Sequence, residues 1–389
     1  MRFSNVAIPL GLAWSSPFCR WQGPLAEMSS VDLAVDVTTR VLRSRGIAAD
    51  DITHYVLGTT VPQLTSFYGV TTITRRLGAP DATGPTIAQA CATSAACVQA
   101  AAAEVELGAH EITLALTTDR TSNGPTLLFP TPSGRGGAPA TEHWVNDPMT
   151  RDPTTGESML DTAENVAAEG GFTREEIDEV ALLRYEQYES VTERPFLVPA
   201  HVPGRKGAVT IVEADSGIHP TTAEGLAKLA PVKPGGVITY GTQTHPADGA
   251  AAMVLATTEQ AWELSGGRGI ARVRSTAFAR VEPARMPKAP VSAALAALAD
   301  AGIGIADIDI VTTHNPFAVN DLWFTRQTGF PLERMNPYGC SLVYGHPQGP
   351  TGARAITELV TALEARGGGR GLFTGCAAGD TAGAVVVEV

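Results

Sequence analysis

Two cysteines and two histidines of this chain stand beside predicted turns, where a side chain can meet a ligand. They are Cys91, His314, His346 and Cys376. A cysteine thiolate is a nucleophile, and a histidine can act as a general base near neutral pH. A reactive thiol, a base and an oxyanion donor are the groups that acyl transfer through a thioester requires. Each residue taken alone also fits a structural role, either as a small buried thiol or as a turn imidazole.

Cys91 lies in the segment IAQACATSAAC, directly before a run of residues that predicts a helix. A helix N-terminus carries the positive end of the macrodipole, which favours the thiolate form of a cysteine. We therefore interpret Cys91 as the candidate nucleophile. Cys97 falls inside the same helical run, and we predict that it is a core residue.

His346 lies in the segment YGHPQGPTGAR, which holds few other side chains that could do chemistry. We interpret this segment as a rigid loop that aims the imidazole as a general base. Cys376, in GLFTGCAAGD, follows a short apolar strand, and a thiol exposed in the following turn could give or take a proton. His314 ends the predicted strand 308–313, and strand ends in α/β folds often face a ligand.

The chain nearly repeats itself. Segments 31–59 and 290–314 each predict an alanine- and leucine-rich helix, a Gly-Ile pair, an Asp-Ile pair and a short apolar strand. Segments 91–118 and 346–375 then follow, each with a loop, a helix and a buried strand. The shared order indicates a duplicated α/β fold with helices layered against sheets. Cys91 and His346 hold equivalent places in the two copies, so their loops can meet near a pseudo-two-fold axis.

Three parts of the chain follow from this pattern. We predict an N-terminal half over 1–118, an inserted loop domain over 119–245 and a C-terminal half over 246–389. The insertion begins with a stretch rich in Gly, Pro, Ser and Thr. Further on, Thr173 and Glu176 have the spacing of a capping box, which predicts the start of a helix. Inserted loops of this kind commonly carry ligand contacts.

Composition excludes several classes of protein. The chain of 389 residues has a net charge of −12, without the basic footprint of a nucleic-acid-binding protein. It has no apolar run long enough to predict a membrane span, and its first residues lack the pattern of a secretory signal. The five cysteines are scattered, with none at zinc-site spacing. We predict reduced thiols, no bound metal and a cytoplasmic location.

From about residue 5 to the C-terminus, the motifs resemble those of the thiolase superfamily. The segment NPYGCSLVYGHPQGPTGAR resembles the thiolase pattern GHP-x-G-x-(S/T)-GAR, and GLFTGCAAGD resembles its closing C-x-G segment. TAENVA with the later TREEID resembles the thiolase loop domain, and GTQTHPADGAAAMVL resembles the segment ending in N-D-G-A-A-A. The resemblance implies the thiolase fold, with two duplicated α/β halves in α-β-α-β-α layers and an inserted loop domain.

The same resemblance implies a reaction. It is the CoA-dependent thiolysis of a 3-oxoacyl-CoA to acetyl-CoA and a shortened acyl-CoA, or the reverse Claisen condensation. Cys91 would carry the acyl group, His346 would activate Cys91, and Cys376 would exchange a proton with the α-carbon. The backbone N–H groups of Cys91 and Ala378 would hold one oxyanion, and His346 and His314 the other. Coenzyme A is then substrate and product, with no tightly bound cofactor.

Two departures from the family pattern concern the oxyanion donors. His314 stands where the N-E-A-F motif has asparagine, with Phe317 retained, and this resembles the sterol-carrier-type branch. Ala378 stands where C-x-G has glycine, and a left-handed backbone there would be costly for alanine.

Two further departures concern the substrate. Met159 is flanked by Ser158 and Leu160, whereas short-chain biosynthetic thiolases have H-M-G. Thr244 and His245 replace a Ser-Gly pair associated with the pantetheine arm of coenzyme A. These changes leave the reaction class in place and the identity of the acyl group open.

Two alternatives stay open. A ketosynthase-like condensing enzyme also pairs one cysteine with two histidines, but it does not need Cys376. A thiolase-like subunit that acts only with a small accessory protein is the other. For a thiolase, the implied partners are acyl-CoA substrates and further copies of the chain in a homodimer or homotetramer.

Overall fold

The strands of the N-terminal half form one side of the central sheet. A computed structural model describes all residues, 1–389. In it, β4 (His54–Gly58) pairs in parallel with β6 (Ile112–Arg120). Strand β6 pairs antiparallel with β11 (Ala247–Ala256), and β5 (Thr86–Ile87) forms the edge beyond β4.

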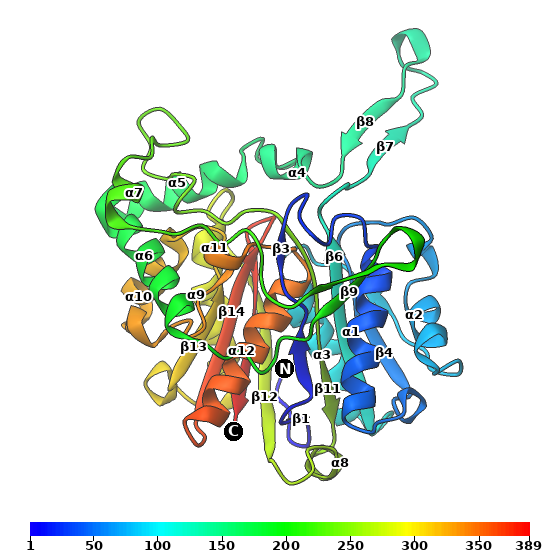
Figure 1. Ribbon diagram of the computed structural model, residues 1–389. Coiled ribbons are helices and arrows are strands. Elements are labelled where there is room, and N and C mark those ends of the chain that lie inside the picture. Colours follow the sequence, from blue (N-terminus) through cyan, green and yellow to red (C-terminus); the bar gives the residue numbers. More distant parts are fainter.

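The C-terminal half repeats this arrangement (Figure 1). There, β13 (Ile310–His314) pairs in parallel with β14 (Arg370–Ala377), and β14 pairs antiparallel with β15 (Thr381–Glu388). Strands β1 (Ala7–Pro9) and β12 (Ile270–Arg280) pair with each other and join the two halves into one sheet of eleven strands. The remaining strands are β2 (Ala13–Ser15), β3 (Cys19–Arg20), β7 (Thr126–Phe129), β8 (Ala140–His143), β9 (Ala200–Pro203) and β10 (Val209–Val212).

The chain forms twelve α-helices, which pack in layers with this sheet. They are α1 (Ser30–Ser44), α2 (Val70–Leu77), α3 (Thr93–Glu106), α4 (Asp147–Thr150), α5 (Met159–Gly170), α6 (Arg174–Ser190), α7 (Ala223–Ala227), α8 (Thr258–Leu264), α9 (Ala289–Ala301), α10 (Val319–Thr328), α11 (Ser341–Tyr344) and α12 (Pro350–Ala365). The predicted capping box is present at α6, where the Thr173 side chain accepts a hydrogen bond from Glu176 N–H. None of the helices has the length and apolar character that crossing a membrane would take.

Helices α3 and α12 form the middle layer of the fold. Their buried side chains share one core with inward-facing residues of strands from both halves. Helix α1 packs on the outer face of the N-terminal half, and α9 packs on the outer face of the C-terminal half. Because successive strand residues point to opposite faces, each strand serves both an inner and an outer core. The predicted α-β-α-β-α layers of a duplicated α/β fold are confirmed.

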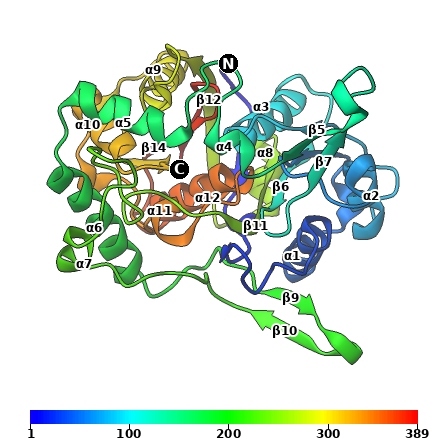
Figure 2. The ribbon, with the colours of Figure 1, turned by 90° about the horizontal axis from the view of Figure 1, so that it is seen from above.

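The insertion covers one end of this core. Helices α5 and α6 share a small core with Phe317 and with Cys376 at the end of β14. The hairpin β7–β8 projects away from the body (Figure 1), and the hairpin β9–β10 extends past α1 (Figure 2). The division into three parts, with the last beginning at residue 246, stays a prediction. Strand β11, which follows His245, pairs along its length with β6 of the N-terminal half. By strand pairing it belongs with that half, just as β15 belongs with β14.

A buried ion pair ties the insertion to α12. The Arg354 guanidinium donates to both carboxylate oxygens of Asp215, at 2.6 and 2.7 Å, and to Glu358 at 2.9 Å. Asp215 also accepts from Tyr188 Oη, at 3.1 Å. The side chains of Arg354 and Asp215 are fully buried. Since α12 follows the His346 loop, this pair anchors the helix that positions the candidate base.

Substitution Asp215→Ala is expected to lower the free energy of unfolding by about 3–5 kcal/mol, because it leaves the buried Arg354 charge without its main partner. Urea denaturation followed by tryptophan fluorescence measures this change. The matched control is Arg76→Ala, which removes the exposed ion pair with Asp32 and should cost no more than about 1 kcal/mol. Equal losses in the two variants would contradict the anchoring role of Asp215.

Candidate active site

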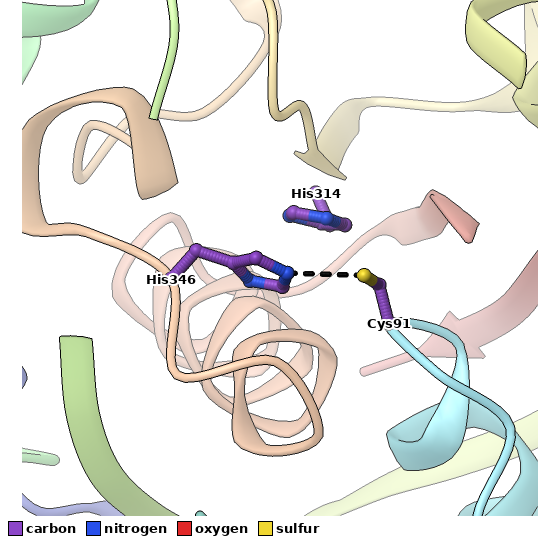
Figure 3. A group of neighbouring side chains, drawn as sticks. All are labelled: Cys91, His314 and His346. Carbon is purple, nitrogen blue, oxygen red and sulfur yellow. Dashed lines mark hydrogen bonds between the residues drawn. The ribbon is translucent and has the colours of Figure 1, made fainter. Parts of the chain in front are cut away.

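Cys91 and His346 meet where the N-terminal ends of α3 and α12 come together (Figure 3). The two residues lie 255 positions apart in the chain, yet His346 Nε2 is 3.1 Å from Cys91 Sγ. The duplicated halves predict this meeting of equivalent loops. The distance lets the imidazole accept the thiol proton directly.

A strained turn presents Cys91. Ala90, directly before it, has a φ of 44°, a left-handed conformation that alanine adopts at a cost of about 1–3 kcal/mol. Thr93, at the start of α3, holds this turn. Its Oγ1 accepts from Gln89 N–H at 2.8 Å and donates to the Ala90 carbonyl at 2.7 Å. The turn leaves the Cys91 side chain partly exposed ahead of the helix.

Two hydrogen bonds hold His346, one at its backbone and one at its ring. Its backbone N–H donates to the His245 carbonyl at 2.8 Å, and its Nδ1 lies 2.6 Å from Thr351 Oγ1. With the Thr351 hydroxyl accepting the Nδ1 proton, Nε2 keeps its lone pair for the Cys91 thiol. Sequence reasoning missed Thr351, although it stands in the first turn of the helix that follows the histidine.

Asp119, another residue that sequence reasoning missed, connects the loop after β4 to the His346 loop. This buried carboxylate accepts from the N–H groups of Thr60, Val61 and Gly349 at 2.8–2.9 Å. It also accepts from the hydroxyls of Thr59 and Thr60. Burial raises the pKa of Asp119 to about 6. The carboxylate therefore holds the His346 loop of one half against the other half, close to Cys91.

His314 lies on top of His346. The two rings are stacked with their centroids 4.0 Å apart, and His314 comes from the end of β13. Its Nδ1 is 3.2 Å from Ser341 Oγ, while its Nε2 is buried without a partner. The structure thus brings three of the four predicted residues into one cluster and leaves one ring nitrogen of His314 free for a ligand.

Cys376 is buried at the end of β14. The sequence left two interpretations, a thiol exposed in a turn and a small buried thiol. The structure shows the buried one, because α5 and α10 pack over this strand end. Asn320 Nδ2 donates to Cys376 Sγ at 3.2 Å. Burial raises the pKa of Cys376 well above its usual range, with the neighbouring Cys91 adding to the effect. Asn320 was not predicted, and its only signal is the polar pair Asn320–Asp321 between apolar residues.

The Ala378 backbone lies near Cys91, and its N–H favours the thiolate form of the Cys91 sulfur. The left-handed residues of this turn are Gly379 and Asp380, with φ of 83° and 61°, so Ala378 does not have the costly backbone considered from its sequence. Alanine therefore replaces the expected glycine without strain.

The remaining predicted residues lie around the cluster. Phe317 is buried in the same core as Cys376, and Met159 packs against that core. Thr244 Oγ1 donates to the Ser341 carbonyl at 2.6 Å, so this hydroxyl is occupied by the protein. Its neighbour His245 keeps a buried Nε2 without a partner.

Burial controls the charge state of the cluster. It raises the pKa of Cys91 to about 12, although the N–H groups of Ala378 and Cys91 favour the thiolate. It lowers the pKa of His314 to about 3, and burial together with His314 holds the pKa of His346 well below its usual range. Burial therefore favours a thiol and a neutral imidazole in the resting pair. It opposes the thiolate that the helix dipole favours.

The alkylation rate of Cys91 by iodoacetamide is expected to keep rising above about pH 8, because the resting thiol must lose a proton. Peptide mapping by mass spectrometry isolates the Cys91 signal from that of buried Cys97. A Cys97→Ser variant should give the same profile. A plateau that begins below about pH 7 would indicate a thiolate–imidazolium pair and contradict the neutral resting state.

Comparison with known proteins gives a consistent picture. The thiolase N-terminal domain model matches residues 12–259, and the thiolase C-terminal domain model matches residues 268–389. An acetyl-CoA acetyltransferase of Chromobacterium violaceum is 32% identical over 375 residues, covering 94% of this chain and 95% of that protein.

Two solved structures have the same fold. The crystal structure of the Bacillus anthracis acetyl-CoA acetyltransferase superposes with a TM-score of 0.91 at 28% identity, over 100% of this chain and 99% of that one. Human mitochondrial 3-ketoacyl-CoA thiolase in complex with CoA superposes with a TM-score of 0.90 at 25% identity, over 100% and 99% of the two chains.

Proposed function

This chain belongs to the thiolase family and is a thiolase-type acyltransferase, and we propose that it works through a thioester on Cys91. The observation that carries this proposal is the 3.1 Å contact between Cys91 Sγ and His346 Nε2. Because both groups rest uncharged, His346 takes the thiol proton as the sulfur attacks, and no charged pair has to form in advance.

In thiolysis, Cys91 attacks the 3-oxo carbon of a 3-oxoacyl-CoA. The bond between C2 and C3 breaks, and the departing acetyl-CoA enolate takes a proton from the Cys376 thiol. The thiol of coenzyme A then takes the acyl group from Cys91, and condensation is the reverse. The bond from Asn320 to Cys376 Sγ supports this role, since it favours the thiolate that remains.

Two sets of donors surround the reacting carbons. The N–H of Ala378 is near enough to Cys91 to favour its thiolate, so we propose that it donates to the oxyanion of the acyl group. His314 Nε2 has no protein partner, and its ring is stacked on His346, so it is proposed to serve the enolate oxygen together with His346.

Coenzyme A thioesters are the proposed substrates, as the names of the similar proteins suggest. No tightly bound cofactor is part of this proposal. Among acyl groups, the acetyl unit named in the bacterial relatives is the first choice. The likeness to the sterol-carrier-type branch rests on His314 alone, and the relatives named above do not support it.

A thioester on Cys91 is the expected product of brief exposure to acyl-CoAs and 3-oxoacyl-CoAs. Intact-protein mass spectrometry with peptide mapping measures it, and the mass of the adduct identifies the acyl group. His346→Ala is expected to lower the acylation rate by at least about a hundredfold while the fold survives. Unchanged acylation in that variant would contradict the role of His346.

The same assay separates the alternatives. Cys376→Ser should stop turnover of a 3-oxoacyl-CoA in a thiolase, whereas a ketosynthase-like enzyme would keep its activity. An absence of any adduct in a folded protein with a free Cys91 thiol, reversed by a small accessory protein, would favour the partner-dependent form.

A homodimer is the proposed assembly, and one exposed apolar surface supports it. Leu64, Phe67 and Tyr68 have exposed fractions of 93%, 95% and 75%. They lie beside Gly69, which packs against Thr86 of the edge strand β5. A second copy would cover both the apolar side chains and the unpaired strand edge. A homotetramer would need a further contact surface. The projecting hairpin β7–β8 offers one, because it carries the exposed Leu128 and Phe129.

Sedimentation equilibrium is expected to give a dimer for the unchanged chain and a monomer for Phe67→Glu, since a charge cannot be buried there without a partner. Leu107→Glu is the matched control, because Leu107 is similarly exposed at the end of α3, away from this surface. A dimer that persists in Phe67→Glu would place the interface elsewhere.

A further inference from the structure

The side chain of Asn320 is held by the thiol of Cys376 alone. Its Nδ2 donates to Cys376 Sγ at 3.2 Å, and both residues are buried. The amide oxygen Oδ1 is also buried, and it has no partner in the protein. One end of this amide therefore contacts the candidate acid, and the other end is uncommitted.

The neighbouring residue, Asp321, shows what a structural polar side chain looks like at the same place. Its carboxylate accepts from Arg184 Nε at 2.9 Å. It also accepts from Thr313 Oγ1 at 2.9 Å and from Asn315 Nδ2 at 2.6 Å. Asp321 thus ties several segments together, whereas the Asn320 side chain ties none.

The position of Asn320 would suit an apolar side chain. Cys376 lies in an apolar core with Phe317 and Val319, which stand close to Asn320 in the chain. A buried amide with an unpartnered oxygen is less stable in such a core than a leucine of similar size. The contact of Asn320 with the sulfur is therefore better explained by chemistry than by packing.

We propose that Asn320 is a positioning residue for proton transfer by Cys376 and that its amide serves both states of the sulfur. This inference rests on the proposed thiolase function and deepens it. Nδ2 donates to the sulfur when Cys376 is a thiolate. When Cys376 is a thiol, a half-turn about the Cβ–Cγ bond of Asn320 lets Oδ1 accept the S–H. Because Oδ1 has no partner, this rotation gives up no other hydrogen bond to the protein.

The step that depends on Asn320 is proton exchange at C2 of acetyl-CoA. The Cys376 thiolate takes a proton from C2, so that the C–H bond breaks and an S–H bond forms. The electron pair of the C–H bond moves to the enolate oxygen. Burial raises the pKa of Cys376 well above its usual range, and the N–H of Asn320 offsets part of the cost of the thiolate. The reverse step from an S–D group puts deuterium on C2.

Deuterium incorporation into acetyl-CoA in heavy water, followed by mass spectrometry, tests this proposal. Asn320→Leu keeps the size of the side chain and removes the donor, so the exchange rate is expected to fall about ten- to a hundredfold. Acylation of Cys91 by acetyl-CoA should keep its rate. The melting temperature should stay the same or rise, because leucine leaves no unpartnered amide in the apolar core. A purely structural role would lower stability instead.

Thr325→Val is the matched control. Thr325 lies on the same helix, α10, and donates to a different sulfur, Met335 Sδ, at 3.7 Å, so exchange should be unchanged in this variant. Asn320→Gln keeps an amide on a longer side chain and should retain more exchange than Asn320→Leu.

Unchanged exchange in folded Asn320→Leu would overturn the proposal, as would an equal loss of exchange and acylation. Equal exchange rates in Asn320→Gln and Asn320→Leu would also contradict the role of the amide. Acylation of Cys91 in the unchanged chain reports on the proposed function itself, so a failure of that function is seen separately.

Discussion

The close contact between α3 and α12 is the constraint on which the rest of the molecule depends. Gly352 lies so near Ser94 that a Cβ on the glycine would be 2.9 Å from the Cβ of Ser94. Ser94 Oγ also donates to the Gly349 carbonyl. Only small residues allow this approach, which explains the abundance of alanine in the two helices. Because the helices begin side by side, the residues ahead of them, Cys91 and His346, have to meet.

Burial then determines the chemistry of that meeting point. A thiol and an imidazole in contact with water could exchange a proton before any substrate binds. Here burial opposes a charge on either residue, although Cys91 stays partly exposed, and this favours proton transfer at the moment when the sulfur attacks. The one acidic group nearby, Asp119, receives five hydrogen bonds and is thereby kept for holding the loops rather than for proton transfer.

The duplication was readable from the sequence because helix and strand periodicity repeat in the same order. That pattern predicted the layers and placed Cys91 opposite His346. It did not reveal Thr351, Ser341, Asn320 or Asp119, because these polar residues lie at or near the ends of helices and of a strand, where a single polar side chain carries no periodic signal. The burial of Cys376 depends on helices far away in the chain, and the pairing of β11 with β6 depends on neighbours that strand patterns do not specify.

His314 shows how burial can reserve one atom for a ligand. Its Nε2 is buried without a protein partner. Such a nitrogen costs about 1–3 kcal/mol, so its retention in the fold is offset only when something binds it. The hydroxyl of Ser341 decides which kind of group can bind. When Ser341 donates to Nδ1, Nε2 carries the proton and can donate to an oxyanion, and when Ser341 accepts from Nδ1, Nε2 can only accept. The proposed role of His314 as an oxyanion donor therefore requires the Ser341 hydroxyl to point at the ring.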